Sequence, residues 1–386
     1  MNIRIMEIAR RFAREHEVTF ALTTRWKDDE AFCDAIRRQG FGVIARPGNV
    51  GRAAYLESAL ELLRGRPPIN AWRGSRALEK ELMLRIGSYD VIQLEYEMFG
   101  NLPYLFAKVK RPIVSIVLHD LMSEAFARIA QIEPTLLLRW LRLINVPGFK
   151  RIERRLLRRF DLSIVMSKRE HDLIARHVPE PKILMVPNCA DSSAPPLKEA
   201  GNSAPVILFI GQMDYPPNID AARWLITEIF PRVRTEYASA RLLLVGGASE
   251  PAKLGLKGEG VEYVGGVDDV TPFYRQADVV AAPLRAGGGT RLKILEAMAR
   301  GRPVVSTTLG AEGLDAIDGR HLVIADTPDE IAAGILSLFR DGDRRASICA
   351  EARSMVVARF NWDNAVQVLI DRYVELHRRR LKADQA

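Results

Sequence analysis

A glycine run followed by charged residues in the second half of the chain has the composition of an anion-binding site. The residues concerned are Gly287, Gly288, Gly289, Thr290, Arg291, Lys293 and Glu296. We expect Thr290 to cap a helix over residues 291–300 that ends at Gly301. The start of such a helix carries unpaired N–H groups and the positive end of a dipole, so it favours an anion. Two cations strengthen that preference, and the carboxylate of Glu296 can accept hydrogen bonds from hydroxyls. A nucleotide sugar supplies both phosphates and hydroxyls.

A purely structural interpretation of the same residues is also open. The glycines are then a flexible turn, and Lys293 with Glu296 forms a surface ion pair at i, i+3 spacing. Neither a Walker pattern nor Gly-x-Gly-x-x-Gly occurs nearby to identify another nucleotide site. The absence of these competing patterns favours the ligand-binding interpretation.

Short apolar runs alternate with helical patterns on both sides of this segment. Strands are predicted over 206–212, 241–247, 261–265, 278–284 and 303–307. This alternation is typical of an α/β domain with a doubly wound parallel sheet. A last helix after Asn361 presents its apolar residues on one face.

Polar residues follow two predicted strands in the first half of the chain. A helix over 1–15 precedes strands at 17–24 and 41–46, and further strands follow at 90–96 and 112–118. Glu95 and Glu97 end one strand, and His119 with Asp120 follows the next. Open α/β sheets bind ligands at these carboxyl ends, so Glu95 and His119 are candidates for an acceptor site. The structural alternatives are a hydrogen-bonded His119 at a strand end and Asp120 as a helix cap.

The segment 135–160 combines an apolar stretch containing Trp140 with a cluster of arginines. A basic amphipathic segment of this kind can lie at the surface of an anionic membrane. An ordinary surface helix with outward-pointing arginines has the same composition. The sequence alone leaves both interpretations open.

The composition of the 386-residue chain fits two globular domains with ordinary cores. It is 48% hydrophobic, and no apolar run reaches the length of a membrane span. The three cysteines are far apart and the N-terminus lacks a signal pattern, so we expect a cytoplasmic location, with peripheral attachment at the inner membrane face as a further option. The net charge of +8 indicates an anionic partner. Nucleic acid is not expected, because no nucleic-acid-binding motif is present.

The run from Gly289 to Met298, followed by Gly301 and Pro303-Val304-Val305, resembles the donor-site signature of retaining GT-B glycosyltransferases of family 4, the group 1 transferases. The segment Phe209 to Asn218 is similar to the opening of their C-terminal domain. The resemblance implies two Rossmann-like domains facing a cleft, with a C-terminal helix crossing back to the first domain. It places an acceptor-binding domain at 1–190, a linker at 191–204, a donor-binding domain at 205–360 and the crossing helix at 361–386.

The resemblance also implies a reaction, in which a sugar moves from a UDP- or GDP-linked donor to an acceptor hydroxyl with retention. It implies no metal, and an acceptor that is a sugar, a glycolipid or a lipid-linked oligosaccharide in polysaccharide or glycolipid biosynthesis. The expected catalytic residues are His119, Glu95 and Asp120. The expected donor-binding residues are Gly211, Gly288, Gly289, Thr290, Arg291, Lys293 and Glu296, with Val264 and Val267 beside the base.

Three features depart from the family pattern. The chain begins with the helix that normally follows a first strand, so we expect the natural protein to carry extra N-terminal residues. Gln212 stands where many relatives have an arginine, and Gly288 stands where they have the first of two glutamates. These departures keep two alternatives open, namely an inactive transferase-like subunit that binds a partner or a membrane, and a nucleotide-sugar epimerase on the same fold.

Overall fold

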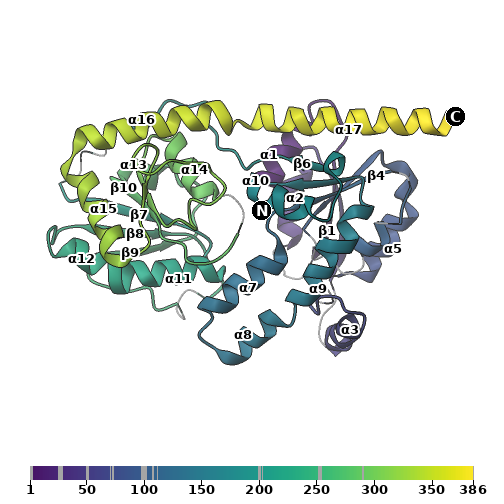
Figure 1. Cartoon of the computed structure of the whole chain (residues 1–386), viewed down its shortest axis with the longest axis horizontal. Helices are drawn as coiled ribbons and strands as arrows, with labels where there is room; N and C mark the ends of the chain where they lie inside the picture. The colour runs from purple at the N-terminus through teal and green to yellow at the C-terminus, as the bar shows by residue number, and fades with distance from the viewer. Residues whose placement is uncertain are drawn as a thin grey trace. The chain divides into compact units, whose positions relative to one another are not determined.

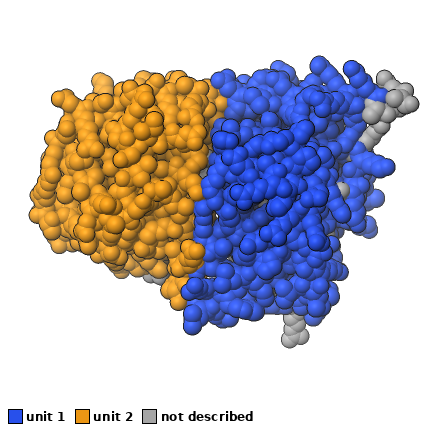
Figure 2. Space-filling model, in the orientation of Figure 1, with its two compact units in different colours: residues 1–130, 135–187, 363–386 blue, residues 131–134, 188–362 orange. Residues whose placement is uncertain are grey.

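The computed structural model describes most of the chain and divides it into two compact units (Figures 1 and 2). Unit 1 comprises Met1–Ala130, Thr135–Pro187 and Asp363–Ala386, and unit 2 comprises Gln131–Pro134 and Asn188–Trp362. The described residues are 3–24, 29–48, 52–69, 71, 74–96, 102–106, 108–110, 112–198, 201, 203–250, 254–288 and 291–385.

The strands of unit 1 are all parallel but form two sheets among the described residues. One sheet pairs β1 (Thr19–Thr24) with β2 (Gly42–Pro47). The other has the order β3 (Val91–Glu95), β4 (Ile113–Leu118), β5 (Leu162–Val165), β6 (Ile183–Met185). In a doubly wound sheet of order 3-2-1-4-5-6, strand 1 joins the two halves. By that order strand 1 would lie between β1 and β3, and no described strand pairs with both of them.

Helices cover the larger sheet of unit 1, and β4 is buried along its whole length. Such burial on both faces explains why its sequence is apolar apart from Ser115. Phe106, Phe149 and Phe160 belong to the core around this sheet. The α-helices described in unit 1, including those that pack on the smaller sheet, are α1 (Ile3–Phe12), α2 (Asp29–Arg37), α3 (Arg52–Leu63), α5 (Arg76–Leu84), α6 (Leu102–Phe106), α7 (Met122–Ile132), α8 (Leu136–Leu143), α9 (Val146–Arg151), α10 (Lys168–Ala175) and α17 (Trp362–Gln385), with a π-helical turn at Ile152–Leu156.

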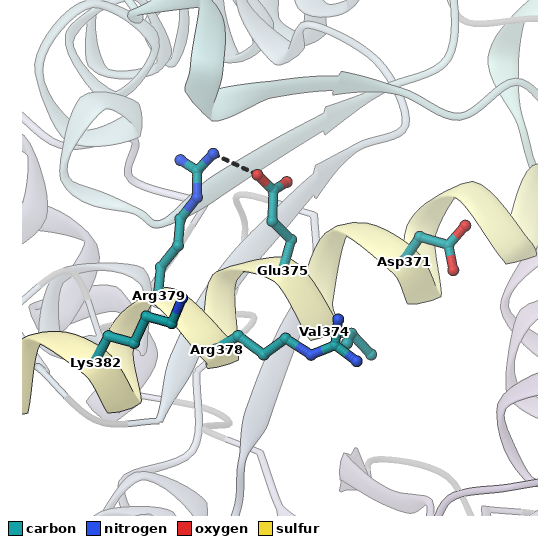
Figure 3. Close-up of a pocket in the computed structure, with 6 residues that line it drawn as sticks. All are labelled: Asp371, Val374, Glu375, Arg378, Arg379 and Lys382. Carbon is teal, nitrogen blue, oxygen red and sulfur yellow. Dashed lines mark ion pairs between the residues drawn. The ribbon is translucent and has the colours of Figure 1, made fainter.

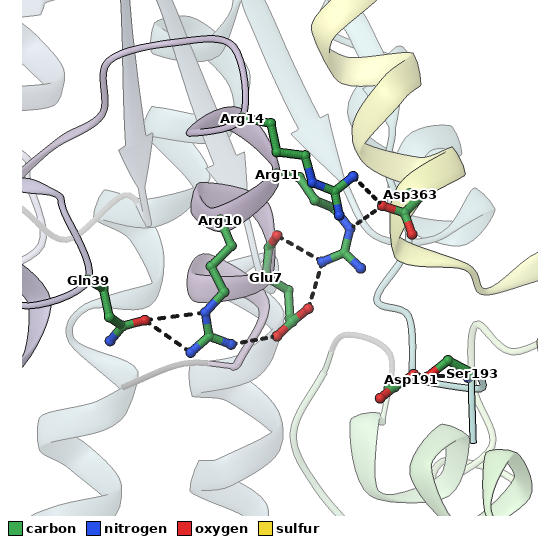
Figure 4. A network of polar contacts seen from close by, with 8 residues as sticks. All are labelled: Glu7, Arg10, Arg11, Arg14, Gln39, Asp191, Ser193 and Asp363. Atoms are coloured by element: carbon green, nitrogen blue, oxygen red, sulfur yellow. Dashed lines mark hydrogen bonds and ion pairs between the residues drawn. The ribbon is translucent and has the colours of Figure 1, made fainter. Parts of the chain in front are cut away.

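The long C-terminal helix α17 packs on unit 1 through both apolar and charged contacts. Its predicted apolar face is confirmed, because Val366, Leu369 and Tyr373 are buried. The carboxylate of Asp363 accepts hydrogen bonds from Arg11 of α1 at 3.0 Å and from Arg14 at 2.9 Å (Figure 4). The two ends of unit 1 in the sequence are therefore joined in space.

Unit 2 contains one parallel sheet in the order β12-β11-β10-β7-β8-β9. The predicted alternation of strands and helices is confirmed, and so is the doubly wound α/β class. Its strands are β7 (Val206–Ile210), β8 (Arg241–Val245), β9 (Val261–Gly265), β10 (Val279–Ala282), β11 (Val304–Ser306) and β12 (Val323–Ile324). Its helices are α11 (Pro216–Trp224), α12 (Phe230–Arg234), α13 (Thr271–Gln276), α14 (Leu292–Ala299), α15 (Pro328–Arg340) and α16 (Gly342–Arg359).

The predicted start of α14 was wrong, whereas its end was right. Arg291, and not Thr290, occupies the N-cap position, and its side chain makes no capping hydrogen bond. A guanidinium has only donors, so it cannot serve the N–H groups of the first turn. At the other end Gly301 has φ +70°, its N–H donates to Met298 O, and the N–H of Arg302 donates to Ala297 O. These two bonds form a Schellman motif, which requires the left-handed glycine.

Candidate active site

The glycine loop of unit 2 follows β10 and leads into α14. Gly287 has φ +97°, and a Cβ there would lie 3.0 Å from the hydroxyl of Tyr215. The carbonyl oxygen of Gly288 accepts a hydrogen bond from the guanidinium of Arg291. Gly289 and Thr290 lie outside the described residues. The hydrogen bond to Gly288 therefore holds the guanidinium of Arg291 close to the backbone of the loop.

Arg291 is a buried cation of the glycine loop. The residue is 8% exposed, and its Nε and Nη2 atoms have no hydrogen-bond partner among the described residues. Burying a charged group without partners is costly, and a bound anion would remove that cost. The predicted anion site at this loop thus has a buried cation, two of whose nitrogens have no hydrogen-bond partner among the described residues.

Lys293 lies beside Arg291 and points toward the end of β7. Its ammonium donates to Asn218 Oδ1 at 2.8 Å and lies 4.3 Å from the ring centroid of Phe209. A Cβ at position 211 would lie only 2.8 Å from Lys293 Nζ, so Gly211 leaves the space that the ammonium occupies. Burial, together with the nearby charge of Arg291, lowers the pKa of Lys293 to about 7.

Glu296 lies one turn further along α14 and is held by a different partner. The hydroxyl of Tyr274 donates to Glu296 Oε2 at 3.3 Å. Burial raises the pKa of Glu296, although the charge of Arg300 and the Tyr274 hydrogen bond oppose that rise. Lys293 contacts Asn218 and Glu296 contacts Tyr274, so the i, i+3 surface ion pair is not what this structure contains.

The residues predicted to lie beside a nucleotide base are at the end of β9. Val264 is in the strand, and Val267 follows it and is exposed. The loops after β8 and β9 approach each other closely, because a Cβ at Gly247 would lie 3.6 Å from Gly266 Cα. Tyr263 fixes the first loop by donating to Gly246 O at 2.9 Å. The role of Val264 and Val267 stays a prediction.

In unit 1 the structure brings two of the predicted catalytic residues into contact. The imidazole Nε2 of His119, which follows β4, lies 2.6 Å from Glu95 Oε2 at the end of β3. The ring of Tyr96 stacks on that of His119, with centroids 4.1 Å apart. Tyr96 adopts φ +82°, an uncommon backbone conformation for a non-glycine residue, and this turn places its ring over the imidazole.

Asp120 is the third predicted catalytic residue. It lies between β4 and α7, near the buried carboxyl group of Glu170 at the start of α10. Burial, and then the charge of Asp120, raises the pKa of Glu170 to about 7. Glu170 also accepts hydrogen bonds from the N–H groups of Met166 and Ser167 in a capping box. Glu97, the other predicted carboxylate, lies outside the described residues.

Several residues of both sites were missing from the sequence-based candidates. They are Asn218, Phe209 and Tyr274 in unit 2, and Gln93, Tyr96 and Tyr373 in unit 1. Asn218 belongs to the family-like segment after β7, which was a usable signal for that residue. Gln93 could be placed two residues before Glu95 on the same face of a strand. Nothing local indicated Tyr373, which lies 280 positions from its hydrogen-bond partner Gln93.

A hollow of about 460 Å³ lies along the surface of α17 (Figure 3). Glu375, which lines it, is already paired with Arg379. All of its lining residues come from this one helix, and none is a predicted site residue: Asp371, Val374, Glu375, Arg378, Arg379 and Lys382. The described residues contain no cluster of three or more His, Cys, Asp or Glu side chains arranged to hold a metal ion.

Two family models match consecutive parts of the chain. The model described as "Glycosyl transferase 4-like domain" matches residues 1–189, and the model "Glycosyl transferases group 1" matches residues 204–341. The second match contains the glycine loop, Lys293 and Glu296. The chain belongs to the group 1 glycosyl transferases.

Curated relatives and solved structures agree with this family. A phosphatidyl-myo-inositol mannosyltransferase of Mycolicibacterium smegmatis is 30% identical over 188 residues, which cover 46% of this chain and 48% of that protein. The chain thus spans about half the length of that relative. A protein of the same description from Propionibacterium freudenreichii is 25% identical over 83% of this chain and 79% of its own length.

The fold of this glycosyltransferase-family chain is also that of the Anabaena protein HepE. That crystal structure, in complex with UDP and glucose, superimposes with a TM-score of 0.68 over 96% of this chain and 94% of its own. At 16% identity the likeness shows the shared GT-B fold alone. The predicted fold class is therefore confirmed.

Proposed function

We propose that the chain transfers a sugar from a nucleotide-sugar donor to an acceptor hydroxyl with retention at the anomeric carbon. The observation that supports this most is the buried guanidinium of Arg291, two of whose nitrogens have no hydrogen-bond partner within the described part of the chain. Arg291 and Lys293 both lie at the start of α14, within the residues matched by the group 1 model. The donor site is assigned to unit 2 and the acceptor site to unit 1.

The donor site would stabilise the diphosphate as it leaves. Negative charge develops on the leaving group in the transition state, and fixed cations in a site with little water stabilise it. Arg291 and Lys293 supply that charge, and Lys293 takes over the role for which many relatives use an arginine at position 212. Glu296 would accept hydrogen bonds from the ribose hydroxyls. UDP is the nucleotide in the HepE complex, and the mannosyltransferase relatives direct attention to mannosyl donors.

His119 would contact the acceptor hydroxyl, with Glu95 holding the imidazole in place. A base at this position assists attack by accepting the hydroxyl proton, a contribution of roughly 10²–10⁴ in rate for general bases. Relatives named for phosphatidyl-myo-inositol suggest an acceptor with a lipid-linked headgroup. The carboxylate that relatives place at position 288 is replaced here by a backbone carbonyl bonded to Arg291, so the donor sugar must be held by other groups.

The apolar face of α8 is proposed to lie at an anionic membrane. None of the described helices is both long and apolar enough to cross a bilayer. In α8, however, no residue is buried, and Leu136, Leu137 and Trp140 are 80%, 64% and 57% exposed. Arginines on α8 and through residues 150–159 supply the charge that attracts anionic headgroups. Peripheral attachment would bring unit 1 to a lipid-linked acceptor.

Replacing Leu137 and Trp140 with serine should release the chain from vesicles that contain anionic lipid. Each exposed side chain contributes about 1.5–3 kcal/mol when it is fully buried, so the partition constant should fall at least tenfold. Co-sedimentation with anionic and with neutral vesicles measures this. Val368→Ser on α17, where Val368 is 50% exposed, is the control and should bind as wild type. Equal binding by all three proteins would contradict membrane attachment through α8.

Glu296→Ala tests the donor site directly. The change should weaken binding of UDP or GDP by about ten- to a hundredfold, because it removes charge-assisted hydrogen bonds to the ribose. Calorimetric titration of wild type and variant with each nucleotide measures the loss and identifies the preferred base. Glu262→Ala, an exposed glutamate of the same unit paired with Arg241, is the matched control. Unchanged affinity in Glu296→Ala would remove this residue from the donor site, and absence of any binding would refute the transferase assignment.

A further inference from the structure

A line of hydrogen-bonded side chains, partly or fully buried, connects the C-terminal helix α17 to His119. Tyr373 of α17 donates a hydrogen bond to Gln93 of β3, whose amide donates to Glu95, which contacts His119. We propose that Tyr373 and Gln93 are positioning residues that fix the orientation and tautomer of His119 through Glu95. This inference rests on the proposed function, in which His119 contacts the acceptor hydroxyl.

The hydrogen bonds of this line have one consistent direction. The hydroxyl of Tyr373 donates to Gln93 Oε1 at 2.7 Å, so the Gln93 side-chain NH2 faces Glu95 and donates to Oε1 at 2.5 Å. Tyr373 has a single hydroxyl hydrogen. The fully buried Ser115, whose Oγ lies 2.5 Å from the Tyr373 oxygen, must therefore be the donor in that contact. Tyr373 thus prevents the Gln93 amide from flipping.

The end of the line determines which imidazole nitrogen carries a hydrogen. Burial opposes ionisation of Glu95, but the His119 hydrogen bond, the charges of His119 and Arg4, and the Gln93 hydrogen bond together lower its pKa. A carboxylate only accepts hydrogen bonds, so His119 Nε2 must donate to Glu95 Oε2. Whenever the ring is neutral, its basic lone pair is therefore on Nδ1, the nitrogen suited to accept a proton.

Tyr373 is more than an anchor for α17, because other contacts hold that helix. Arg380 donates to Asp161 Oδ1 at 2.7 Å, and Arg11 donates to Asp363 at 3.0 Å (Figure 4). Val366 and Leu369 are buried against the same unit. A buried phenolic hydroxyl that served packing alone would be replaced by phenylalanine at little cost, whereas a network member leaves its partners unsatisfied when it is removed.

Tyr373→Phe removes the hydroxyl and keeps the ring. We expect ¹⁵N NMR to show that the neutral form of His119 carries its hydrogen on Nε2 in wild type and is a mixture of tautomers in the variant. The chain has six histidines, and His119→Ala assigns the signal. In transfer assays kcat should fall about fivefold, the order of one lost hydrogen bond, with the KM for the donor unchanged. On a plot of kcat against pH, the loss of activity at low pH should move to higher pH. The reason is that the Gln93 amide is no longer held in place as a hydrogen-bond donor to Glu95, so the pKa of Glu95 rises.

Two further variants separate positioning from folding. Gln93→Met removes the donor to Glu95 directly, so it should reproduce both the tautomer change and the movement of the low-pH loss of activity. Arg380→Met loosens α17 at another contact and should leave both readouts as in wild type. The charged groups that face Glu95 (His119 and Arg4) stay in place in all of these variants.

The outcomes distinguish this inference from the proposed function. Wild-type tautomer and pH profile in both Tyr373→Phe and Gln93→Met would overturn the positioning role, as would an equal change in Arg380→Met. Full transferase activity in His119→Ala, together with the expected tautomer change in Tyr373→Phe, would overturn the acceptor role of His119 but confirm the hydrogen-bond line. Loss of activity in His119→Ala with the expected change in Tyr373→Phe supports both.

Discussion

Lys293→Met is expected to weaken nucleotide-sugar binding by about ten- to a hundredfold, the loss of one or two charge-assisted hydrogen bonds. In the structure the ammonium is already placed by Asn218 Oδ1 at 2.8 Å and by the ring of Phe209, and Gly211 leaves room beside it. A ligand phosphate would therefore meet a cation that needs little rearrangement. Methionine keeps the length and apolar body of the side chain but has no charge.

The wild-type site should also take up a proton when it binds the donor. The pKa of Lys293 is lowered to about 7, so at pH 8 much of the free site is neutral, and an anionic diphosphate favours the charged form. Affinity should thus decrease as pH rises from 7 to 9. Proton uptake should be substantial at pH 8 and close to zero at pH 6, where Lys293 is already charged.

Titration of UDP-glucose and GDP-mannose in buffers of different ionisation enthalpy measures both effects. Lys293→Met should lose affinity together with the pH dependence. Lys257→Met, an exposed lysine in a loop of the same unit, is the control and should behave as wild type. A Lys293→Met variant that binds like wild type, or that keeps the proton uptake, would show that another cation holds the diphosphate.

His119→Ala is expected to lower kcat for sugar transfer by about a hundred- to a thousandfold, within the range for loss of a general base. Binding of the donor nucleotide should not change, because its proposed site consists of residues of unit 2. His119 is held on its edge by Glu95 at 2.6 Å and on its face by Tyr96. Such constraint is costly for a side chain that has only a packing role.

The matched control for this change is His171→Ala. His171 lies on α10 in the same unit and contacts Glu180 at 3.1 Å, far along the chain from the β3 and β4 ends. Product formation from a labelled nucleotide sugar and a lipid-linked acceptor gives kcat, and calorimetry gives nucleotide affinity. If His119→Ala loses nucleotide binding as well, or if His171→Ala is equally slow, the assignment of His119 to the acceptor step is wrong.

The sequence by itself determined the class of the fold and the outline of the donor site. The spacing of apolar residues identified strands and helices after residue 206, because this spacing depends only on neighbours within one helical turn or one strand. The alternation of these strands and helices then predicted a parallel sheet. Gly301 similarly specified the end of α14 through its own backbone conformation. The positions of Lys293 and Glu296 on one short helix followed from their spacing, whereas Arg291 lies at its N-cap.

Only the tertiary structure decided which partner each charged side chain has. Lys293 meets Asn218, 75 positions earlier, and Tyr373 meets Gln93, 280 positions away. Helical spacing would also allow an ion pair between Lys293 and Glu296. The two side chains have other partners because Asn218 and Tyr274 approach α14 from elsewhere in the fold. The division of the unit 1 strands into two sheets, one ending at β1 and the other at β3, likewise depends on hydrogen bonds between strands that are distant in the sequence. Contacts at such separations arise from how the elements pack, and local sequence patterns carry no information about them.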